Sequence, residues 1–150
     1  NRNTALGHQA LYGDGGATGS NNTAVGSSAL YKNTTGEGNV ALGYQAGFGP
    51  ADENGWSISD NYATFIGYQA SRALNISNTE TLENITAIGK NAQVGASNSI
   101  VLGGTGMDAV NVGIGLTTPT ATLEILKNES QETNPTALKI QNLSASSQSY

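Results

Sequence analysis

Side chains that could support catalysis are few in this sequence, and they do not cluster. His8 is the only histidine, so a Ser-His-Asp arrangement would have to use it as the base. It occupies a repeated position that other copies of the surrounding pattern fill with Ser27, Tyr44, Tyr68 or Lys90. Such variety is typical of a surface position. We therefore predict no catalytic residue and no enzymatic activity.

Carboxylates gather in the stretch 47–62, which holds Asp52, Glu53 and Asp60. Paired carboxylates can hydrolyse glycosidic bonds when they flank a substrate, but a solvated acidic loop is the simpler interpretation. The Asp-Gly-Gly sequence at 14–16 lacks the repeats of calcium-binding loops. The chain also has no cysteine to supply a thiolate ligand. We therefore predict no metal site and no cofactor.

Aromatic side chains in the same stretch are the candidates for binding. Trp56 is the only tryptophan, and Phe48 and Tyr62 accompany it. An exposed tryptophan on a loop can stack on a sugar or anchor a partner protein. Alternatively, Trp56 and Phe48 pin this loop to the body of the protein. We name Phe48, Trp56 and Tyr62 as receptor-contact candidates and leave both roles open.

These residues are connected by a repeated unit that consists of a small residue, an aliphatic residue and glycine. In the first five copies, alanine follows three residues after the glycine, and the glycines are 12 to 24 residues apart. A fixed unit with connections of variable length predicts a β-solenoid with loop insertions. We expect each glycine at a bend or a crowded wall, where a Cβ would clash or φ must be positive. The repeat glycines are Gly7, Gly26, Gly43, Gly67, Gly89, Gly103 and Gly115.

Each unit predicts a short strand with apolar residues on both faces. Neighbouring side chains of a strand point in opposite directions, and pairs such as Ala41-Leu42 and Ala87-Ile88 are apolar at both positions. One face can fill the inside of the coil. The other face needs a second surface, and the sequence contains no amphipathic helix to supply it. The simplest supplier is another copy of the same chain.

The composition excludes several classes of function. Six basic residues are spread singly in a chain of net charge −5, so a phosphate-binding stripe is absent and no nucleic-acid partner is expected. No apolar run approaches the roughly 18 residues that span a bilayer, so we expect no membrane insertion. The chain begins inside a repeat at Asn3, and we expect it to be a fragment of a longer protein.

The sequence predicts two regions, β-roll repeats over 1–115 and a β connector or the start of a further β module over 116–150. Insertions interrupt the first region at 47–62 and 71–84; the second insertion is compatible with a short helix or with a strand pair. In the second region we expect strands over 123–127 and 137–143, separated by a polar loop.

The repeats resemble the left-handed β-roll in the heads of trimeric autotransporter adhesins. The segment 112–119, followed by Thr122 to Ile125, resembles a connector in bacteriophage tail-fibre and tail-spike proteins. It departs from the usual Gly-Thr-Thr-Ser-Pro order at Leu116 and Thr118. The resemblance covers about residues 1–127. It implies an all-β fold, a left-handed β-roll or β-solenoid that forms an intertwined homotrimer, and host-surface attachment.

We therefore predict a non-enzymatic structural segment of a phage tail fibre or spike, located in the virion. Its expected partners are two further copies of itself, a host cell-surface glycan or protein, and neighbouring fibre domains. One alternative is the head of a bacterial trimeric adhesin at the cell surface. Another is a monomeric solenoid of the ice-binding type, although Thr-X-Thr sequences are scattered here.

Overall fold

The computed structural model describes residues 2–13, 19–48, 59–73, 76 and 80–125. These residues form short β-strands and a single 3-10 turn, so the all-β prediction is confirmed. The chain divides into two compact units, residues 1–110 and 111–150. The division that the sequence suggested after residue 115 stays a prediction.

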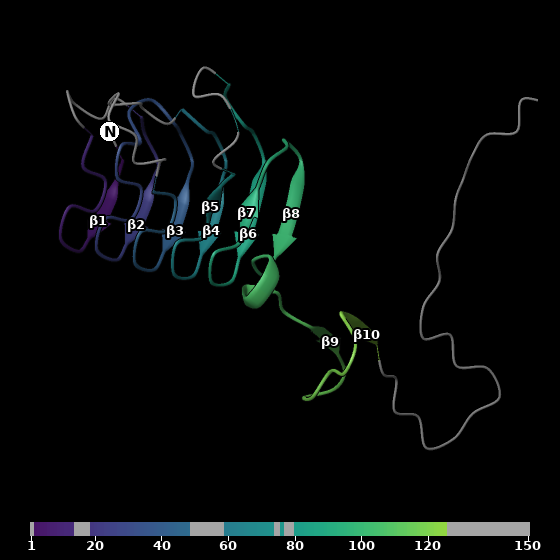
Figure 1. Cartoon of the computed structure of the whole chain (residues 1–150). Helices are drawn as coiled ribbons and strands as arrows, with labels where there is room; N and C mark the ends of the chain where they lie inside the picture. The colour runs from purple at the N-terminus through teal and green to yellow at the C-terminus, as the bar shows by residue number, and fades with distance from the viewer. Residues whose placement is uncertain (1, 14–18, 49–58, 74–75, 77–79, 126–150) are drawn as a thin grey trace, which may run out of the picture. The chain divides into compact units, whose positions relative to one another are not determined.

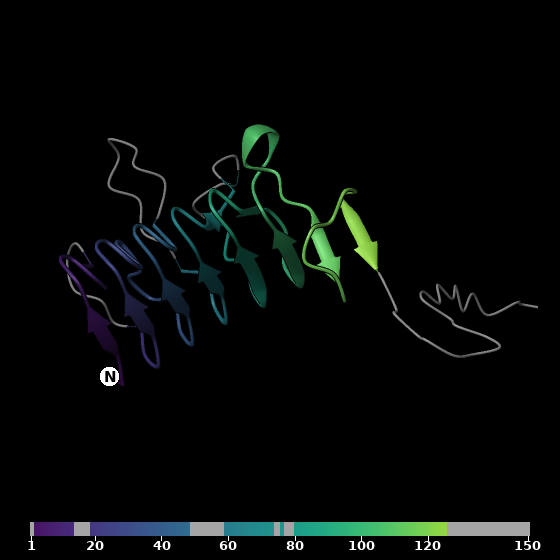
Figure 2. The same ribbon diagram turned by 90° about the horizontal axis from the view of Figure 1, so that it is seen from below.

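The first unit is built on a parallel sheet of six strands (Figure 1), in the order β1, β2, β3, β4, β6 and β8. Neighbours in the sheet are therefore successive copies of the repeat, and after each strand the chain returns to start the next one alongside. The view from below shows these returns repeated along the sheet (Figure 2). The strands are Thr4–Leu6 (β1), Thr23–Val25 (β2), Val40–Leu42 (β3), Thr64–Ile66 (β4), Ile85–Ile88 (β6) and Ser99–Leu102 (β8).

A second parallel pair, β5 (Ser71–Arg72) and β7 (Gln93–Val94), lies in the returns that follow β4 and β6. Residues 71–84 were expected to hold a helix or a strand pair of their own. Within the described part of that insertion, Ser71–Arg72 is a strand, but its partner lies outside the insertion. Two-residue strands carry too little periodicity to be read from the sequence.

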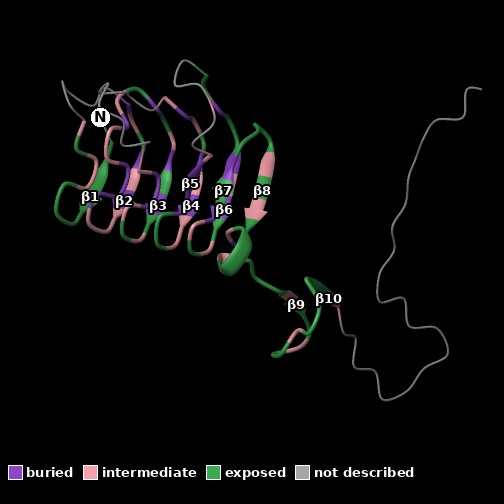
Figure 3. Ribbon diagram, in the orientation of Figure 1, coloured by how far each residue is buried: buried purple, intermediate pink, exposed green. Residues whose placement is uncertain are grey.

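The inward face of the large sheet is filled by the middle residue of each strand. Ala24, Ala41 and Ala87 are fully buried, and Phe65 takes their place in β4. The alanine after each repeat glycine lies in the same core, as Ala29, Ala46, Ala70 and Ala92. Buried segments therefore recur in each successive copy (Figure 3). Small side chains dominate because the returning chain runs close to the strands.

Asparagines extend this core at the N-terminal end of the strands. The side-chain oxygen of Asn3 accepts the N–H of Asn22, that of Asn22 accepts the N–H of Asn39, and that of Asn39 accepts the N–H of Ala63, at 2.8–2.9 Å. Asn22 and Asn39 are almost fully buried, so these bonds satisfy backbone donors that would otherwise be costly. The ladder ends at Ala63, and Ile85 continues the column as an apolar residue.

The turn after each strand brings successive copies into close backbone contact. All seven repeat glycines have positive φ. At Gly43, where φ is 133°, an added Cβ would lie 2.7 Å from the carbonyl oxygen of Gly67 in the next copy. Glycine is therefore required by the spacing of the copies as well as by the bend.

Residues other than glycine also adopt the left-handed conformation at repeated corners, which we did not predict. The second residue after the glycine has φ of 53–57°, and so do the residues that precede most strands, with φ of 54–60°. Asparagine tolerates this conformation better than most residues, which explains part of the asparagine content. The two groups are Gln9, Ser28, Gln45, Gln69 and Asn91, and Asn21, Tyr62, Asn84 and Asn98.

In the second unit, β9 (Val112–Ile114) pairs in parallel with β10 (Leu123–Ile125). The predicted strand over 123–127 is observed for its first three residues. The loop and the strand expected over 128–143 lie outside the described residues.

Candidate functional site

The predicted binding residues occupy separate places. The Phe48 ring stacks on Tyr31, with ring centroids 5.2 Å apart, and Tyr31 stacks on Tyr12 at 5.4 Å. These three residues are fifth after their repeat glycines, so they form an aromatic column along the returns. Tyr62 is 64% exposed and lies at a corner before β4, where its N–H donates to the carbonyl of Glu37. Trp56 lies outside the described residues.

Stacking already occupies one face of the Phe48 ring. This arrangement holds the residue that begins the 47–62 insertion against the preceding copy, as the pinning alternative requires. Tyr44 and Tyr68 form a second stacked pair, with centroids 5.3 Å apart, at the position that directly follows the glycine. Stacked rings in adjacent copies stabilise the register of the copies.

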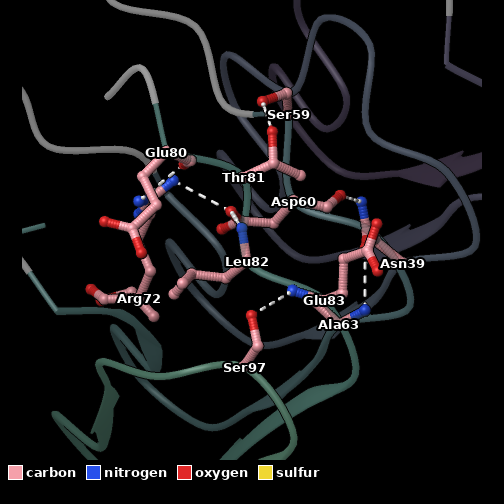
Figure 4. Close-up of polar contacts among 11 residues, drawn as sticks. Asn39, Ser59, Asp60, Ala63, Arg72, Glu80, Thr81, Leu82, Glu83 and Ser97 are labelled. Atoms are coloured by element: carbon pink, nitrogen blue, oxygen red, sulfur yellow. Dashed lines mark hydrogen bonds and ion pairs between the residues drawn. The ribbon is translucent and has the colours of Figure 1, made fainter. Parts of the chain in front are cut away.

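A buried ion pair lies at the bases of both insertions (Figure 4). The Arg72 guanidinium donates to Asp60 Oδ1 at 2.9 Å, and both side chains are almost completely buried. The same oxygen accepts the N–H of Leu82 at 2.9 Å, and Arg72 Nη2 donates to the carbonyl of Glu80 at 3.1 Å. Asp60 therefore holds residues on both sides of the 71–84 insertion.

Our interpretation of Asp60 as part of a solvated acidic loop is wrong, while Asp52 and Glu53 lie outside the described residues. Asp60 is fully buried because Arg72 and the N–H of Leu82 satisfy it from the following copy. A signal was present in the sequence. Arg72 is fifth after Gly67, at the position that Tyr12, Tyr31 and Phe48 occupy in the earlier copies.

Burial raises the pKa of the Asp60 carboxyl, although the Leu82 N–H and the Arg72 charge act in the opposite direction. Its second oxygen, Oδ2, has no hydrogen-bond partner. The carboxyl group has no access to solvent, so a dissolved substrate does not reach it. The pair therefore anchors the insertions. A second contact between their stems, from Ser59 Oγ to Thr81 Oγ1 at 2.8 Å, has the same effect.

The structure offers no chemistry to His8. Its side chain is exposed on the first turn. Across the described part of the chain, no group of three or more His, Cys, Asp or Glu residues could hold a metal ion. The described ranges also contain no helix that is long and apolar enough to cross a membrane.

The largest unexplained surface is the outward face of the six-stranded sheet. The third residue of each repeat strand points away from the core and forms a file of large aliphatic side chains, which we call the outer apolar column. Leu6 is 67% exposed and Leu42 49% exposed in the single chain. The strand pairing places the members in register. They are Leu6, Val25, Leu42, Ile66, Ile88 and Leu102.

A second file on this face lies two residues earlier. It contains Thr4, Thr23, Thr64 and Thr86, with Val40 and Ile100 between and after them. The outward face is thus flat, regular and mostly apolar, and it lacks charged side chains at these positions. Exposed contiguous patches of this kind mark interaction surfaces.

Comparison of the chain with family models, curated proteins and solved structures found no match.

Proposed function

We propose that the chain is a non-enzymatic structural segment of a trimeric phage tail fibre or spike, in which a left-handed β-solenoid forms the shaft and its insertions meet the host. The observation that carries the proposal is the outer apolar column. The strands place their larger aliphatic residues outward, where the single chain leaves them uncovered.

A second copy of the chain is the occupant that fits this column best. Burying a leucine or isoleucine side chain fully is worth about 1.5–3 kcal/mol, and the column presents six such residues in register. Identical chains place identical columns at the same level, so the apolar files cover one another along their whole length. The number three, and the left-handed coil, come from the resemblance to adhesin heads.

The insertions are the parts suited to contact a host. The Asp60–Arg72 pair fixes the stems of both insertions to the sheet, and the aromatic column fixes the start of the first. A trimer would present three copies of each insertion. Weak contacts to a cell-surface glycan or protein would then combine into strong binding. Trp56 remains our candidate for such a contact.

The assignment to a phage, and hence to a virion, rests on the resemblance of residues 112–125 to a fibre connector. A bacterial trimeric adhesin would use the same outer apolar column in the same way. A monomeric ice-binding solenoid would instead expose the outward threonine file to ice, and it would leave the column uncovered.

The test is to place a charge in the column. Leu42→Glu should convert the trimer to monomer, because three carboxylates would otherwise be buried together without partners. The matched control is Met107→Glu, since Met107 is fully exposed and lies outside the column. Sedimentation equilibrium measures both masses. Equal masses for the two variants would contradict the proposal.

A further inference from the structure

The N-terminal end of the sheet differs from every later level of the stack. Ala5 is exposed, whereas its counterparts Ala24 and Ala41 are fully buried. Asn3 is exposed as well, whereas Asn22 is 1% exposed. The same residue types thus fill equivalent positions, and what differs is whether another coil covers them.

Four backbone hydrogen bonds join the first coil to the second beyond the strands themselves. Gly26 and Ser28 donate their N–H groups to the carbonyls of Leu6 and His8, both at 2.8 Å. Thr4 and Leu11 donate to the carbonyls of Asn22 and Ala29, at 2.8 and 2.9 Å. The equivalent four bonds join the second coil to the third, at 2.8–2.9 Å.

The same pattern identifies four groups on the free side of the first coil. The N–H groups of Gly7 and Gln9 correspond to the donors of Gly26 and Ser28. The carbonyls of Asn3 and Ala10 correspond to the acceptors of Asn22 and Ala29. None of these four groups bonds to a described residue, although their counterparts all bond to the coil before them. An unpaired edge of this kind is a template for a further strand.

We propose that this end of the sheet is a docking surface for one further β-coil of the chain's own repeat sequence, Asn-X-Ala-aliphatic-Gly, lying parallel on β1. The occupant needs carbonyls where Leu6 and His8 have them, and N–H groups where Thr4 and Leu11 have them. Its asparagine would accept the N–H of Asn3, as Asn3 accepts that of Asn22.

Two further features restrict the occupant to this repeat. A Cβ built on Gly7 would lie 2.5 Å from the carbonyl oxygen of Gly26, so the residue that stacks on Gly7 must also be glycine. Tyr12 stacks on Tyr31 through one face of its ring and is 49% exposed. An aromatic residue fifth after the new glycine would cover its other face.

The opposite end of this unit is closed at the equivalent turn. The 3-10 turn η1 (Gly106–Asp108) brings Asp108 onto the last full turn, where its carboxylate accepts bonds from Lys90 Nζ and Asn91 Nδ2, both at 2.7 Å. Asp108 thereby ends the columns that run through Tyr68 and Gln69. The docking surface is therefore specific to the N-terminal end, and it is separate from the outer apolar column.

The experiment fuses a copy of residues 20–38 directly before Asn1 of the full chain. In this fusion the copied asparagine precedes Asn3 by the same spacing that separates Asn3 from Asn22. The matched control carries Gly26→Val in the copy alone. Amide hydrogen exchange at Gly7 and Gln9, followed by NMR, reports whether the coil has docked.

We expect exchange at Gly7 and Gln9 to slow by at least about tenfold in the fusion relative to the unextended chain, because both amides become hydrogen-bonded, and to remain fast in the control. Equal exchange in the fusion and the unextended chain would overturn the proposal, as would equal slowing in the fusion and the control. Light scattering on the same samples reports the trimer separately, so failure of one proposal is distinguishable from failure of the other.

Discussion

The two faces of the six-stranded sheet are built from alternate residues of the same strands, yet they are filled in opposite ways. The inward face carries mainly alanine and is sealed by the returning chain, whereas the outward face carries leucine, isoleucine and valine and is open. A sheet with one wet face normally alternates apolar inward and polar outward residues. The inversion shows that inner packing is limited by close backbone approach, and it leaves the larger apolar area available for association.

The first way to test this difference is to truncate two neighbouring residues of β4 that point to opposite faces. Phe65→Ala should lower the free energy of unfolding by about 3–5 kcal/mol, because it leaves a cavity in a closed core. Ile66→Ala should cost less than about 1 kcal/mol in the monomeric Leu42→Glu background, since that side chain faces outward. Urea unfolding measures both. Equal losses would mean that the two faces are packed alike.

A second test concerns the one ion pair on the sealed side. Arg72→Met should cost about 3 kcal/mol in urea unfolding at neutral pH, because it leaves the Asp60 carboxylate buried without its cation. The double variant Asp60→Asn with Arg72→Met should recover part of that loss. If the double variant is no more stable than Arg72→Met, the buried charge is not the cause.

The smallest expected effect is a pair of opposite pKa shifts. Burial raises the pKa of Asp60 above its ordinary value, so its contribution to stability is present at low pH and is lost as pH rises through the folded-state pKa. Hydrogen bonds from Lys90 and Asn91 lower the pKa of Asp108, so its contribution is present at neutral pH and is lost as pH falls through the folded-state pKa.

The carboxyl carbon shifts of both residues can be followed in one NMR titration. Asp60 should titrate above about 3.9 and Asp108 below it. The reverse order would contradict the burial of Asp60 and the bonding of Asp108.

The repeat made the strands predictable, since an aliphatic-Gly unit recurs at each one from Leu6 to Leu102. The glycines were also readable, because their fixed place in a variable frame implies a steric cause. The buried role of Asp60 was not, because it requires the alignment of Arg72 with the aromatic column of earlier copies. The corners at Gln45 and Gln69 escaped too, since glutamine has no special preference for a positive φ.

The mass of the intact chain in solution tests the central claim most directly. Static light scattering without denaturant should give about three times the 15.3 kDa of one chain, because the outer apolar column is then covered by neighbouring copies. A folded chain of 15.3 kDa would show that the column stays open in water, and it would contradict the trimeric account.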